Sequence, residues 1–428
     1  MSARVILGVG AGIAAYKSCE LLRLLTESGH RVRVVPTPDA LRFVGEATWA
    51  ALSGEPVTTD AWTSVAEVPH VRLGQSADLI LVAPATADLM ARAAAGMAGD
   101  LLTATLLTAR CPVVYAPAMH TEMWEHPATQ ANVALLRSRG AIVIEPAVGR
   151  LTGADSGAGR LPEPAEIFAV ATRLLARGAS GAGGGDRGAS GAGGGDRGAG
   201  GAGGGDPLRP DLAGRRVVVS AGGTREEIDP VRFIGNWSTG TQGYALARTA
   251  VARGAEVIVV AANVALPDPA GAKVIRVVSA RELRDAVTAA AAGADAVVMA
   301  AAVADYRPQT RSAAKIKKDD QPPEPLRLTE NPDILAGLAQ RRAREAAPVV
   351  LVGFAAETDT AAEIAQAKLA RKGCDLLVVN PVGNGLGFGT IDNEAVVYGV
   401  DGFVTQIPRG PKEVLADVVW DLVAERLK

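Results

Sequence analysis

The sequence predicts an α/β protein built from two doubly wound, Rossmann-like domains that a disordered glycine-rich linker joins. Three observations predict this class. Aliphatic, strand-like runs alternate with helix-like runs early in the chain, the same rhythm returns late in the chain, and a decapeptide, GASGAGGGDR, is repeated nearly three times between them. At 428 residues the chain also exceeds the usual size of a single core. We expect domains at residues 1–177 and 207–428, with the linker at 178–206.

The regular spacing of apolar runs predicts the elements of each domain. In the first domain we expect strands at 5–9, 31–35, 78–83, 112–116 and 141–145, and helices at 13–28 and 128–140. In the second we expect strands at 215–222, 256–262, 295–302, 348–357 and 375–380, and helices at 244–253 and 280–292. A hairpin over 396–407 should turn at Asp401 and Gly402. An amphipathic helix over 411–427 follows it.

Composition narrows the classes of partner. Lys and Arg number 44 against 46 acidic residues, a net charge of -2, which indicates neither nucleic-acid nor membrane binding. Small molecules are therefore the expected partners. The three cysteines are far apart and form no CxxC, so we expect neither disulfides nor a zinc site, and a cytoplasmic location. No apolar run reaches the roughly 18 residues of a membrane span.

Ligands of open α/β sheets bind beyond the carboxyl ends of the strands, so the loops that follow each strand matter most. Gly10 and Gly12 follow the first strand and could bring backbone N–H groups to a phosphate. A tight turn that packs a helix is the alternative. The spacing is GxGxG and no acid ends the second strand, which disfavours a dinucleotide. Thr86 and Asp88, after the third strand, are candidate ligands or simply helix caps.

Two of the four histidines lie beside such loops: His70 precedes the third strand and His120 follows the fourth. A structural and a catalytic role are about equally favoured for them.

Five stretches of the first domain together resemble the flavin-dependent cysteine decarboxylases, specifically phosphopantothenoylcysteine decarboxylase of coenzyme A synthesis. They are GIAAYK, PHVRL with His70, APATADL, AAGMAGDLL and PAMHTEMW, and the resemblance spans residues 4–175. It implies a flavodoxin-like FMN domain, usually trimeric, whose sites neighbouring protomers share. The residues implied in FMN binding are Gly10, Gly12, Thr86, Asp88, Ala118 and Met119. His70 and His120 become catalytic candidates, and Met123 belongs to the loop that would hold the substrate carboxylate.

The first domain departs from this pattern twice. The family commonly has Asn where His120 stands, and often a cysteine, a late proton donor, where Gly153 stands. The identity of the late proton donor is therefore open. Because a histidinium can both pair with a carboxylate and release a proton, we hypothesise that His120 compensates for Gly153.

Cationic and glycine-rich segments follow the strands of the second domain. Gly222, Gly223, Gly235, Gly240 and Gly243 lie in two polar loops before a helix, which could approach a phosphate or simply cap that helix. The cluster KIKK at 315–318 follows the next strand-end loop and is either solvated surface or a phosphate contact. Lysines 368 and 372 are spaced to share one helix face. This pattern favours an anionic ligand.

The second domain resembles phosphopantothenate–cysteine ligase over residues 210–425, through DPVRFIGN, AAVADYRP, KIKK, NPDI and GFAAET. The resemblance implies a dimer that activates a carboxylate with CTP and Mg²⁺, forms an acyl-cytidylate and transfers the acyl group to cysteine. The implied nucleotide-binding residues are Met299, Ala300, Ala301, Asp305, Lys315, Pro332, Asp333, Ile334, Leu335, Phe354, Lys368 and Lys372. Asn236 and Lys315 are the implied catalytic residues, and Arg232 and Asn236 would bind phosphopantothenate and the acyl intermediate. Thr241 stands where the family has a lysine, from which we expect weaker phosphate binding.

Together the two resemblances predict a bifunctional enzyme that converts 4′-phosphopantothenate, cysteine and CTP to 4′-phosphopantetheine, with FMN as cofactor. Trimeric first domains and dimeric second domains imply a homo-oligomer, and a dodecamer would satisfy both. A glycine-rich linker of this length holds its ends roughly 30 Å apart, so we expect no tight channel between the sites. Two alternatives remain: a ligase that carries a silent flavin-binding domain, and a non-enzymatic flavin-binding regulator.

Overall fold

The computed structural model describes residues 2–57, 59, 68–150, 156–181, 211–317, 325–345, 348–357, 362–382 and 392–428. The chain forms two compact units, Met1–Arg209 and Pro210–Lys428. Of the predicted linker, residues 182–206 lie outside the described residues. Residues 178–181 belong instead to a helix, α8 (Pro164–Gly181), because extending an existing helix costs far less than starting one.

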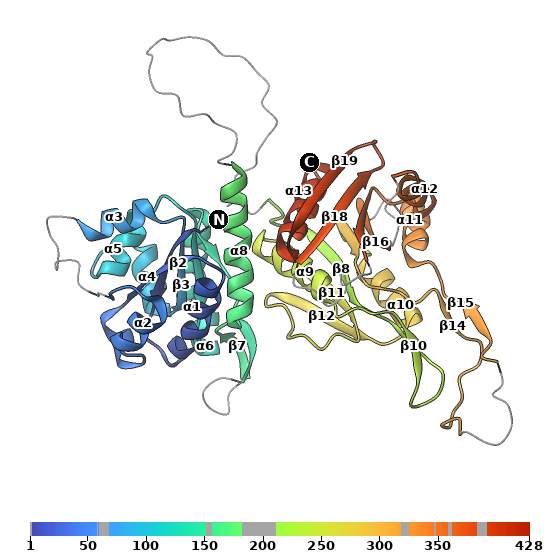
Figure 1. Ribbon diagram of the computed structural model, residues 1–428, viewed down its shortest axis with the longest axis horizontal. Coiled ribbons are helices and arrows are strands. Elements are labelled where there is room, and N and C mark those ends of the chain that lie inside the picture. Colours follow the sequence, from blue (N-terminus) through green and yellow to red (C-terminus); the bar gives the residue numbers. More distant parts are fainter. Residues whose placement is uncertain are drawn as a thin grey trace, which may run out of the picture. The chain divides into compact units, whose positions relative to one another are not determined.

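The first unit contains a five-stranded parallel sheet in the order β2-β1-β3-β4-β5 (Figure 1). Its strands are β1 (Arg4–Val9), β2 (Arg31–Pro36), β3 (Leu79–Ala85), β4 (Val113–Pro117) and β5 (Ile142–Val143). The predicted α/β class is confirmed, although β5 is shorter than the predicted strand at 141–145. A separate antiparallel hairpin, β6 (Ala147–Arg150) with β7 (Ser156–Arg160), follows the sheet.

Helices cover both faces of this sheet. They are η1 (Ile13–Tyr16), α1 (Lys17–Glu27), η2 (Pro38–Arg42), α2 (Glu46–Ser53), α3 (Pro69–Ser76), α4 (Ala87–Ala94), α5 (Leu101–Leu107), α6 (Thr121–Glu125), α7 (Pro127–Ser138) and α8. The helix predicted at 13–28 is thus a 3₁₀ turn followed by α1. Successive strand residues face opposite sides, so Leu7 packs with α1, α2 and α8 whereas Ile6 packs with α4, α5 and α7.

The second unit contains an eight-stranded sheet in the order β12-β11-β8-β13-β16-β17-β18-β19. Its strands are β8 (Arg216–Gly222), β11 (Glu256–Ala262), β12 (Ala272–Val277), β13 (Ala296–Met299), β16 (Val350–Glu357), β17 (Leu376–Pro381), β18 (Asp392–Gly399) and β19 (Val404–Pro411). The strands are parallel as far as β17, and β18 and β19 are antiparallel. The predicted hairpin at Asp401 and Gly402 is confirmed, with Gly402 at a φ of 82°. The edge strand β12 was not predicted.

Two helices, α9 (Thr241–Ala252) and α13 (Lys412–Arg426), cover one face of this sheet. The other face carries α10 (Ala280–Ala290), α11 (Ile334–Glu345) and α12 (Ala362–Lys372). The prediction of an amphipathic final helix is wrong, because α13 packs between α9 and the β18–β19 hairpin and is buried on most sides. Trp420 is fully buried there, and its indole N–H donates to the carbonyl of Leu246.

Two short hairpins complete the second unit: β9 (Arg225–Glu227) with β10 (Phe233–Gly235), and β14 (Tyr306–Pro308) with β15 (Leu328–Glu330). Figure 1 shows β10, β14 and β15 extending away from its main sheet. Strand order reverses between β1 and β3 in the first unit and between β8 and β13 in the second. These switch points are where open α/β sheets bind ligands. Across the described residues, no helix combines the length and apolarity that crossing a membrane would require.

Candidate active sites

The turns after β1 and β3 meet at the switch point of the first unit. The N–H of Gly10 donates to the carbonyl of Pro84 at 3.0 Å, and a Cβ on Gly10 would lie 2.5 Å from that oxygen. A Cβ on Gly12 would contact the Thr86 side chain at 3.8 Å. Gly10 is therefore required by close backbone approach, and Gly10, Gly12 and Thr86 lie where the two turns meet.

Thr86 and Asp88 both have structural roles at the start of α4. Thr86 is the N-cap residue, and its hydroxyl accepts the N–H of Leu89 at 3.3 Å. Asp88 is largely exposed and pairs with Arg92 at 2.9 Å. The helix-cap alternative thus holds for Thr86, and ligand binding by either residue stays a prediction.

Sequence reasoning missed Thr37, which follows β2. Its N–H donates to the carbonyl of Val9, so it lies beside the end of β1. Its hydroxyl is buried and, within the part of the chain that the structure describes, has no hydrogen-bond partner. A buried polar group without a partner is costly unless a ligand or water satisfies it. The only sequence signal was a hydroxyl residue directly after a strand.

The loop after β4 is fixed on two sides. Ala118 donates its N–H to Ala85 at the end of β3, and Met119 donates to Gly159 in β7. Gly159 has a φ of 137°, and a Cβ there would lie 2.4 Å from the carbonyl oxygen of Met119. The β6–β7 hairpin therefore packs directly on this loop. His120 and Met123, which follow in the loop and in α6, are exposed.

Gly153 lies outside the described residues, in the segment that joins β6 to β7. The pairing of Gly149 with Gly157 brings the two ends of that segment together. Burial raises the pKa of the Cys111 and Cys374 thiols to about 11, and raises that of Cys19. Thiols with such pKa values are poor proton donors near neutral pH.

His70 lies in the first turn of α3. Its backbone forms a hydrogen bond at the end of α5 and not with the β4 loop. Its carbonyl accepts the hydroxyl of Thr108, which follows α5. Its Nδ1 is buried and has no hydrogen-bond partner among the described residues. No hydrogen bond joins His70 to His120, both of which the structure describes.

A cavity of about 950 Å³ opens at the carboxyl ends of β13 and β16 in the second unit. Most residues that the sequence predicted to bind nucleotide or intermediate line it: Asn236, Met299, Ala301, Asp305, Pro332, Asp333, Ile334, Leu335, Phe354, Lys368 and Lys372. Sequence reasoning missed Trp237, Asn331 and Arg371, which also line it. Asn236 donates to the carbonyl of Val303, and Asn331 donates to that of Ala304. These bonds fasten the β10 and β15 loops to the loop after β13.

The two cavity lysines are paired with carboxylates. Lys372 contacts Asp333 at 2.7 Å and Lys368 contacts Glu357 at 2.5 Å. Burial would raise the pKa of Asp333, but hydrogen bonds from Lys372 and from the Ala336 N–H outweigh it and lower that pKa. When an anionic ligand binds, its oxygens would therefore replace these carboxylates as the partners of Lys368 and Lys372.

Lys315 and Arg232 do not line this cavity. Arg232 donates to the buried carboxylate of Asp229 and to the carbonyl of Ile316, and the Ile316 N–H also donates to Asp229. Asp229 thus ties the loop that carries Lys315 to the β9–β10 hairpin. Lys315 itself is exposed, and Lys318 of the same cluster lies outside the described residues.

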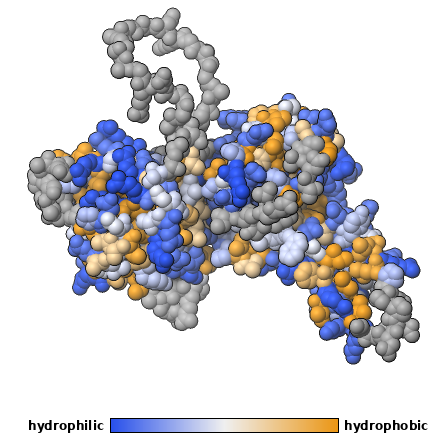
Figure 2. All heavy atoms as spheres, viewed as in Figure 1, coloured by the Kyte–Doolittle hydropathy of each residue, from blue (hydrophilic) through white to orange (hydrophobic). Residues whose placement is uncertain are grey.

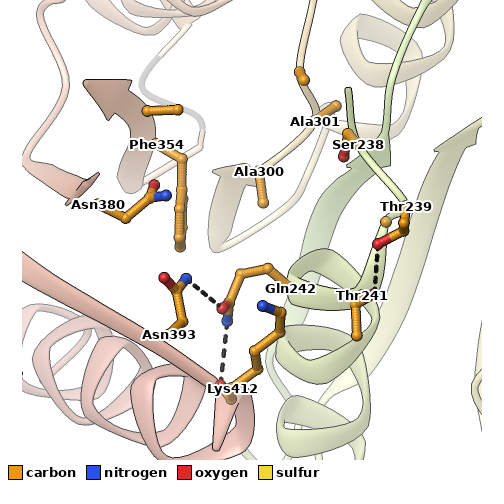
Figure 3. Close-up of a pocket in the computed structure, with 13 residues that line it drawn as sticks. Ser238, Thr239, Thr241, Gln242, Ala300, Ala301, Phe354, Asn380, Asn393 and Lys412 are labelled. Carbon is orange, nitrogen blue, oxygen red and sulfur yellow. Dashed lines mark hydrogen bonds between the residues drawn. The ribbon is translucent and has the colours of Figure 1, made fainter. Parts of the chain in front are cut away.

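A smaller pocket of about 100 Å³ adjoins the cavity and shares Ala301, Ala302, Phe354 and Ala356 with it (Figure 3). Its remaining lining residues are Ser238, Thr239, Gly240, Thr241, Gln242, Ala300, Asn380, Asn393 and Lys412. Ala300, predicted to bind nucleotide, therefore faces this pocket. Gly240 adopts a φ of 83°, where a Cβ would also lie 2.6 Å from Val264. No motif indicated Lys412, which is distant in the chain from the loop at 238–242 that it faces across the pocket.

The fold defines an α/β protein of two doubly wound units, and in the second unit a large cavity opens at the carboxyl ends of the strands. Residues 1–176 match the flavoprotein family, and residues 212–427 match the DNA/pantothenate metabolism flavoprotein C-terminal domain. The coenzyme A biosynthesis bifunctional protein CoaBC of Mycobacterium tuberculosis is 56% identical over 427 residues, covering 98% of this chain and 96% of that protein. This chain belongs to the family of coenzyme A biosynthesis bifunctional proteins, which confirms both resemblances.

The likeness extends to distant bacteria. CoaBC of Bacillus subtilis is 39% identical over 425 residues, covering 98% of this chain and 96% of that protein. A solved structure, the C-terminal domain of a CoaBC, is 34% identical and covers 51% of this chain and 98% of its own, with a TM-score of 0.43.

Proposed function

We propose that this chain catalyses two consecutive steps of coenzyme A biosynthesis. The second unit joins cysteine to 4′-phosphopantothenate with CTP, and the first unit decarboxylates the resulting 4′-phospho-N-pantothenoylcysteine to 4′-phosphopantetheine with FMN. The observation that carries this proposal is the 950 Å³ cavity, whose wall gathers Asn236, Asp305, Phe354 and Lys368 from four separate segments. Near-full-length identity to bifunctional relatives supports the presence of both activities in one chain.

In the ligase step, a carboxylate oxygen of phosphopantothenate attacks the α-phosphorus of CTP and pyrophosphate leaves. The amine of cysteine then attacks the acyl carbon and CMP leaves. Negative charge develops on phosphate oxygens, so Lys368 and Lys372 stabilise the transition state after releasing Glu357 and Asp333. We propose that Asn236 and Arg232 orient the acyl group and that Lys315 contributes a further positive charge.

We propose that Mg²⁺ enters this site bound to CTP. Among the described residues, no cluster of three or more His, Cys, Asp or Glu side chains could hold a metal ion. Mg²⁺ commonly uses substrate phosphates and water as most of its ligands, which agrees with such a site.

The first unit fits a flavin at its β1–β3 switch point. Gly10 lets the turn after β1 pack against the turn after β3, and the unpartnered Thr37 hydroxyl lies beside the end of β1 as a candidate donor to the cofactor. We propose that Gly10, Gly12, Thr37, Thr86, Asp88, Ala118 and Met119 hold FMN. When bound, FMN supplies the oxidation of the cysteine thiol, so that a C=S group can accept the electron pair left by CO₂.

We propose that the chain's own groups bind the substrate and move its protons. His120 and Met123 hold the substrate carboxylate at the β4 loop, and His120 returns a proton late in the reaction. His70 acts as a base or electrostatic partner through its buried Nδ1. We propose that neighbouring protomers share each site, as the family resemblance implies.

We propose that the protein is a cytoplasmic homo-oligomer with dimeric second units. Exposed apolar side chains on the short hairpins of the second unit support this: Val231, Phe233, Trp237, Tyr306, Leu326 and Leu328. Figure 2 shows apolar residues gathered around β14 and β15. Patches of this kind mark interaction sites. Exposed Ile13, Tyr16 and Met97 support trimeric first units in the same way, and a dodecamer would combine both contacts. Three free cysteines agree with a reducing compartment.

The test separates the two activities. The purified full-length chain should carry flavin absorbance and release CO₂ from added phosphopantothenoylcysteine. It should release pyrophosphate from CTP only with phosphopantothenate present, and beyond one turnover only with cysteine present as well. Pyrophosphate without CO₂ would reduce the function to the ligase. CO₂ without pyrophosphate would reduce it to the decarboxylase.

A further inference from the structure

One carboxylate, that of Glu163, links two segments of the first unit that are distant in the chain. Glu163 follows β7 and precedes α8. Its two carboxylate oxygens accept hydrogen bonds from the ammonium group of Lys17 at 3.0 and 3.1 Å, and one of them also accepts a hydrogen bond from the guanidinium of Arg160. Lys17 begins α1, whereas Arg160 ends β7. Glu163 therefore bridges the start of α1 and the end of the β6–β7 hairpin.

This bridge differs from an ordinary surface ion pair, which water and salt screen. The Lys17 side chain is only 15% exposed, so most of it is shielded from water. The Arg160 side chain lies across the hairpin, because a Cβ on Gly149 in β6 would be 3.5 Å from its Nη1 atom. Loss of the Glu163 carboxylate would leave a largely buried lysine close to a second positive charge, which is unfavourable.

The Lys17 end of the bridge is fixed beside the strand switch point. Lys17 directly follows η1, the 3₁₀ turn that comes after Gly10 and Gly12. The next residue, Ser18, is fully buried, and its hydroxyl donates to the carbonyl of Ala83 in β3 at 2.7 Å. Helix α1 also packs against α8 (Figure 1). The ammonium group therefore belongs to a segment that is bonded to β3, next to the turn that we propose holds FMN.

The Arg160 end of the bridge is fixed to the β4 loop. Arg160 adjoins Gly159, whose carbonyl accepts the N–H of Met119. Nearer the start of β7, a Cβ on Gly157 would lie 2.4 Å from the hydroxyl oxygen of Thr121 at the start of α6. The hairpin thus contacts the residues immediately before and after the histidine of this loop, so a displacement of the hairpin would displace that histidine.

We propose that Glu163 is a positioning residue for decarboxylation, which sets the β4 loop and its His120 against the turn after β1. The inference rests on the proposed decarboxylase function. The carboxylate acts through Arg160 and Lys17, which connect it to the hairpin and to α1. Catalysis tolerates little error in the placement of reacting groups, and a shift of about 1 Å can cost roughly 10²-fold in rate. Glu163 therefore matters to the reaction without contacting the reacting atoms.

Hydrogen exchange of the full-length chain, followed by mass spectrometry, tests the bridge without relying on turnover. The amide of Glu163→Gln cannot pair with two cations. We expect the N–H groups of residues 118–120 and 157–160 to exchange roughly tenfold faster in this variant, while those of β1 and β3 are unchanged. Unchanged exchange at 118–120 would overturn the proposal. Faster exchange throughout the first unit would also overturn it, because Glu163 would then support only the stability of the fold.

Steady-state kinetics provide the second readout. Glu163→Gln should lower kcat/KM for CO₂ release roughly tenfold, while CTP-dependent pyrophosphate release stays at the wild-type rate. Glu27→Gln is the matched control, since Glu27 lies in α1 as Lys17 does and pairs with Arg23, but both of these side chains are 64% exposed. This control should match the wild type in exchange and in kinetics. An equal loss of CO₂ release in Glu27→Gln would contradict a specific role of Glu163.

Two further variants decide the matter if Glu163→Gln does not fold. Lys17→Met and Arg160→Met each break one half of the bridge and keep an unbranched apolar side chain. Because either change disconnects the bridge, the double variant should speed exchange at 118–120 little more than each single variant does. Fully additive effects would contradict a shared bridge.

The wild-type chain separates this inference from the decarboxylase proposal. A wild-type chain that releases no CO₂ would contradict the decarboxylase, and the positioning role with it. A wild-type chain that releases CO₂, together with a Glu163→Gln chain that releases it equally fast, would keep the decarboxylase and refute the role of Glu163.

Discussion

The backbone N–H of Met119 donates to the carbonyl of Gly159 at 2.9 Å. This bond joins the loop that carries His120 to the hairpin whose connecting segment carries Gly153. The loop with one position at which the first unit departs from its family pattern, His120, is therefore bonded to the hairpin that flanks the other, Gly153, which itself lies outside the described residues.

Gly159→Ala should impair decarboxylation. The new Cβ would lie 2.4 Å from the Met119 carbonyl and push the β4 loop out of place. We expect CO₂ release to fall at least tenfold, while CTP-dependent pyrophosphate release is unchanged. Gly140→Ala is the matched control, since Gly140 also has a positive φ but nothing lies within 4 Å of its Cβ position. If Gly159→Ala and Gly140→Ala lowered CO₂ release equally, backbone strain would be responsible and not the contact with Met119.

His120→Asn should retain substrate binding but lose the late proton. Asn can hydrogen-bond a carboxylate but cannot release a proton at neutral pH. We expect one turnover of CO₂ release followed by a steady-state rate roughly 10²-fold lower, as is typical for loss of an acid–base group. His120→Ala should in addition weaken binding. Rapid-quench measurement of CO₂ and product separates these steps. His126→Ala, at another exposed histidine, is the control. Normal steady-state turnover in His120→Asn would exclude the proton role.

Asp229→Asn should slow the ligase by detaching the Lys315 loop. Hydrogen bonds from Arg232 hold the pKa of the Asp229 carboxyl well below its usual range, despite its burial. Because the pKa of Asp229 is lower in the folded than in the unfolded chain, its ionised carboxylate stabilises the fold fully above pH ~4. This stabilisation is lost only as the pH falls through the folded pKa. We therefore expect a lower kcat/KM for phosphopantothenate throughout pH 6–8. Glu227→Gln, which removes an exposed pair with Arg311, should have little effect. A wild-type kcat/KM in Asp229→Asn would show that Lys315 needs no such support.

Two carboxylates contact Arg92 and should differ in their effect on stability. Asp100 is 7% exposed and caps α5 through the Thr103 N–H, whereas Asp88 is 75% exposed. Asp100→Asn keeps a capping oxygen but loses the charged hydrogen bond with Arg92, so we expect it to cost about 1–2 kcal/mol in the free energy of unfolding, and Asp88→Asn less than about 0.5 kcal/mol. Urea unfolding of the full-length chain, followed by near-ultraviolet circular dichroism, measures both. A larger loss for Asp88→Asn would contradict this ranking.

The Asp100 difference should depend on pH in a definite direction. Burial raises the pKa of Asp100, but hydrogen bonds from Thr103 and Arg92 outweigh it and lower that pKa. The carboxylate therefore contributes its full stability above the unfolded pKa of about 4, and this is lost as pH falls through the folded pKa. The gap between wild type and Asp100→Asn should accordingly be constant from pH 5 to 8 and narrow below pH 4.

Much of the nucleotide cavity could be predicted from the sequence. Parallel strands share one carboxyl edge, so residues after separate strands, such as Asp305 and Phe354, must lie near each other. Local motifs located Asn236 and Pro332 for the same reason. What could not be predicted were residues whose role depends on distant packing. Thr37 and Lys412 became candidates only through their burial, and Lys368 and Lys372 acquired carboxylate partners that no spacing indicates.

The sequence by itself determined the α/β class, the strand-end loops and the family, because periodicity and short motifs are local and can be recognised without any knowledge of packing. The tertiary structure decided which loops touch. It brought Met119 onto Gly159, buried α13 on most sides, and carried Lys412 to the first turn of α9. Contacts between residues 40 or 170 positions apart depend on how helices and strands pack, and burial, which sets the electrostatics of a site, exists only after that packing is complete.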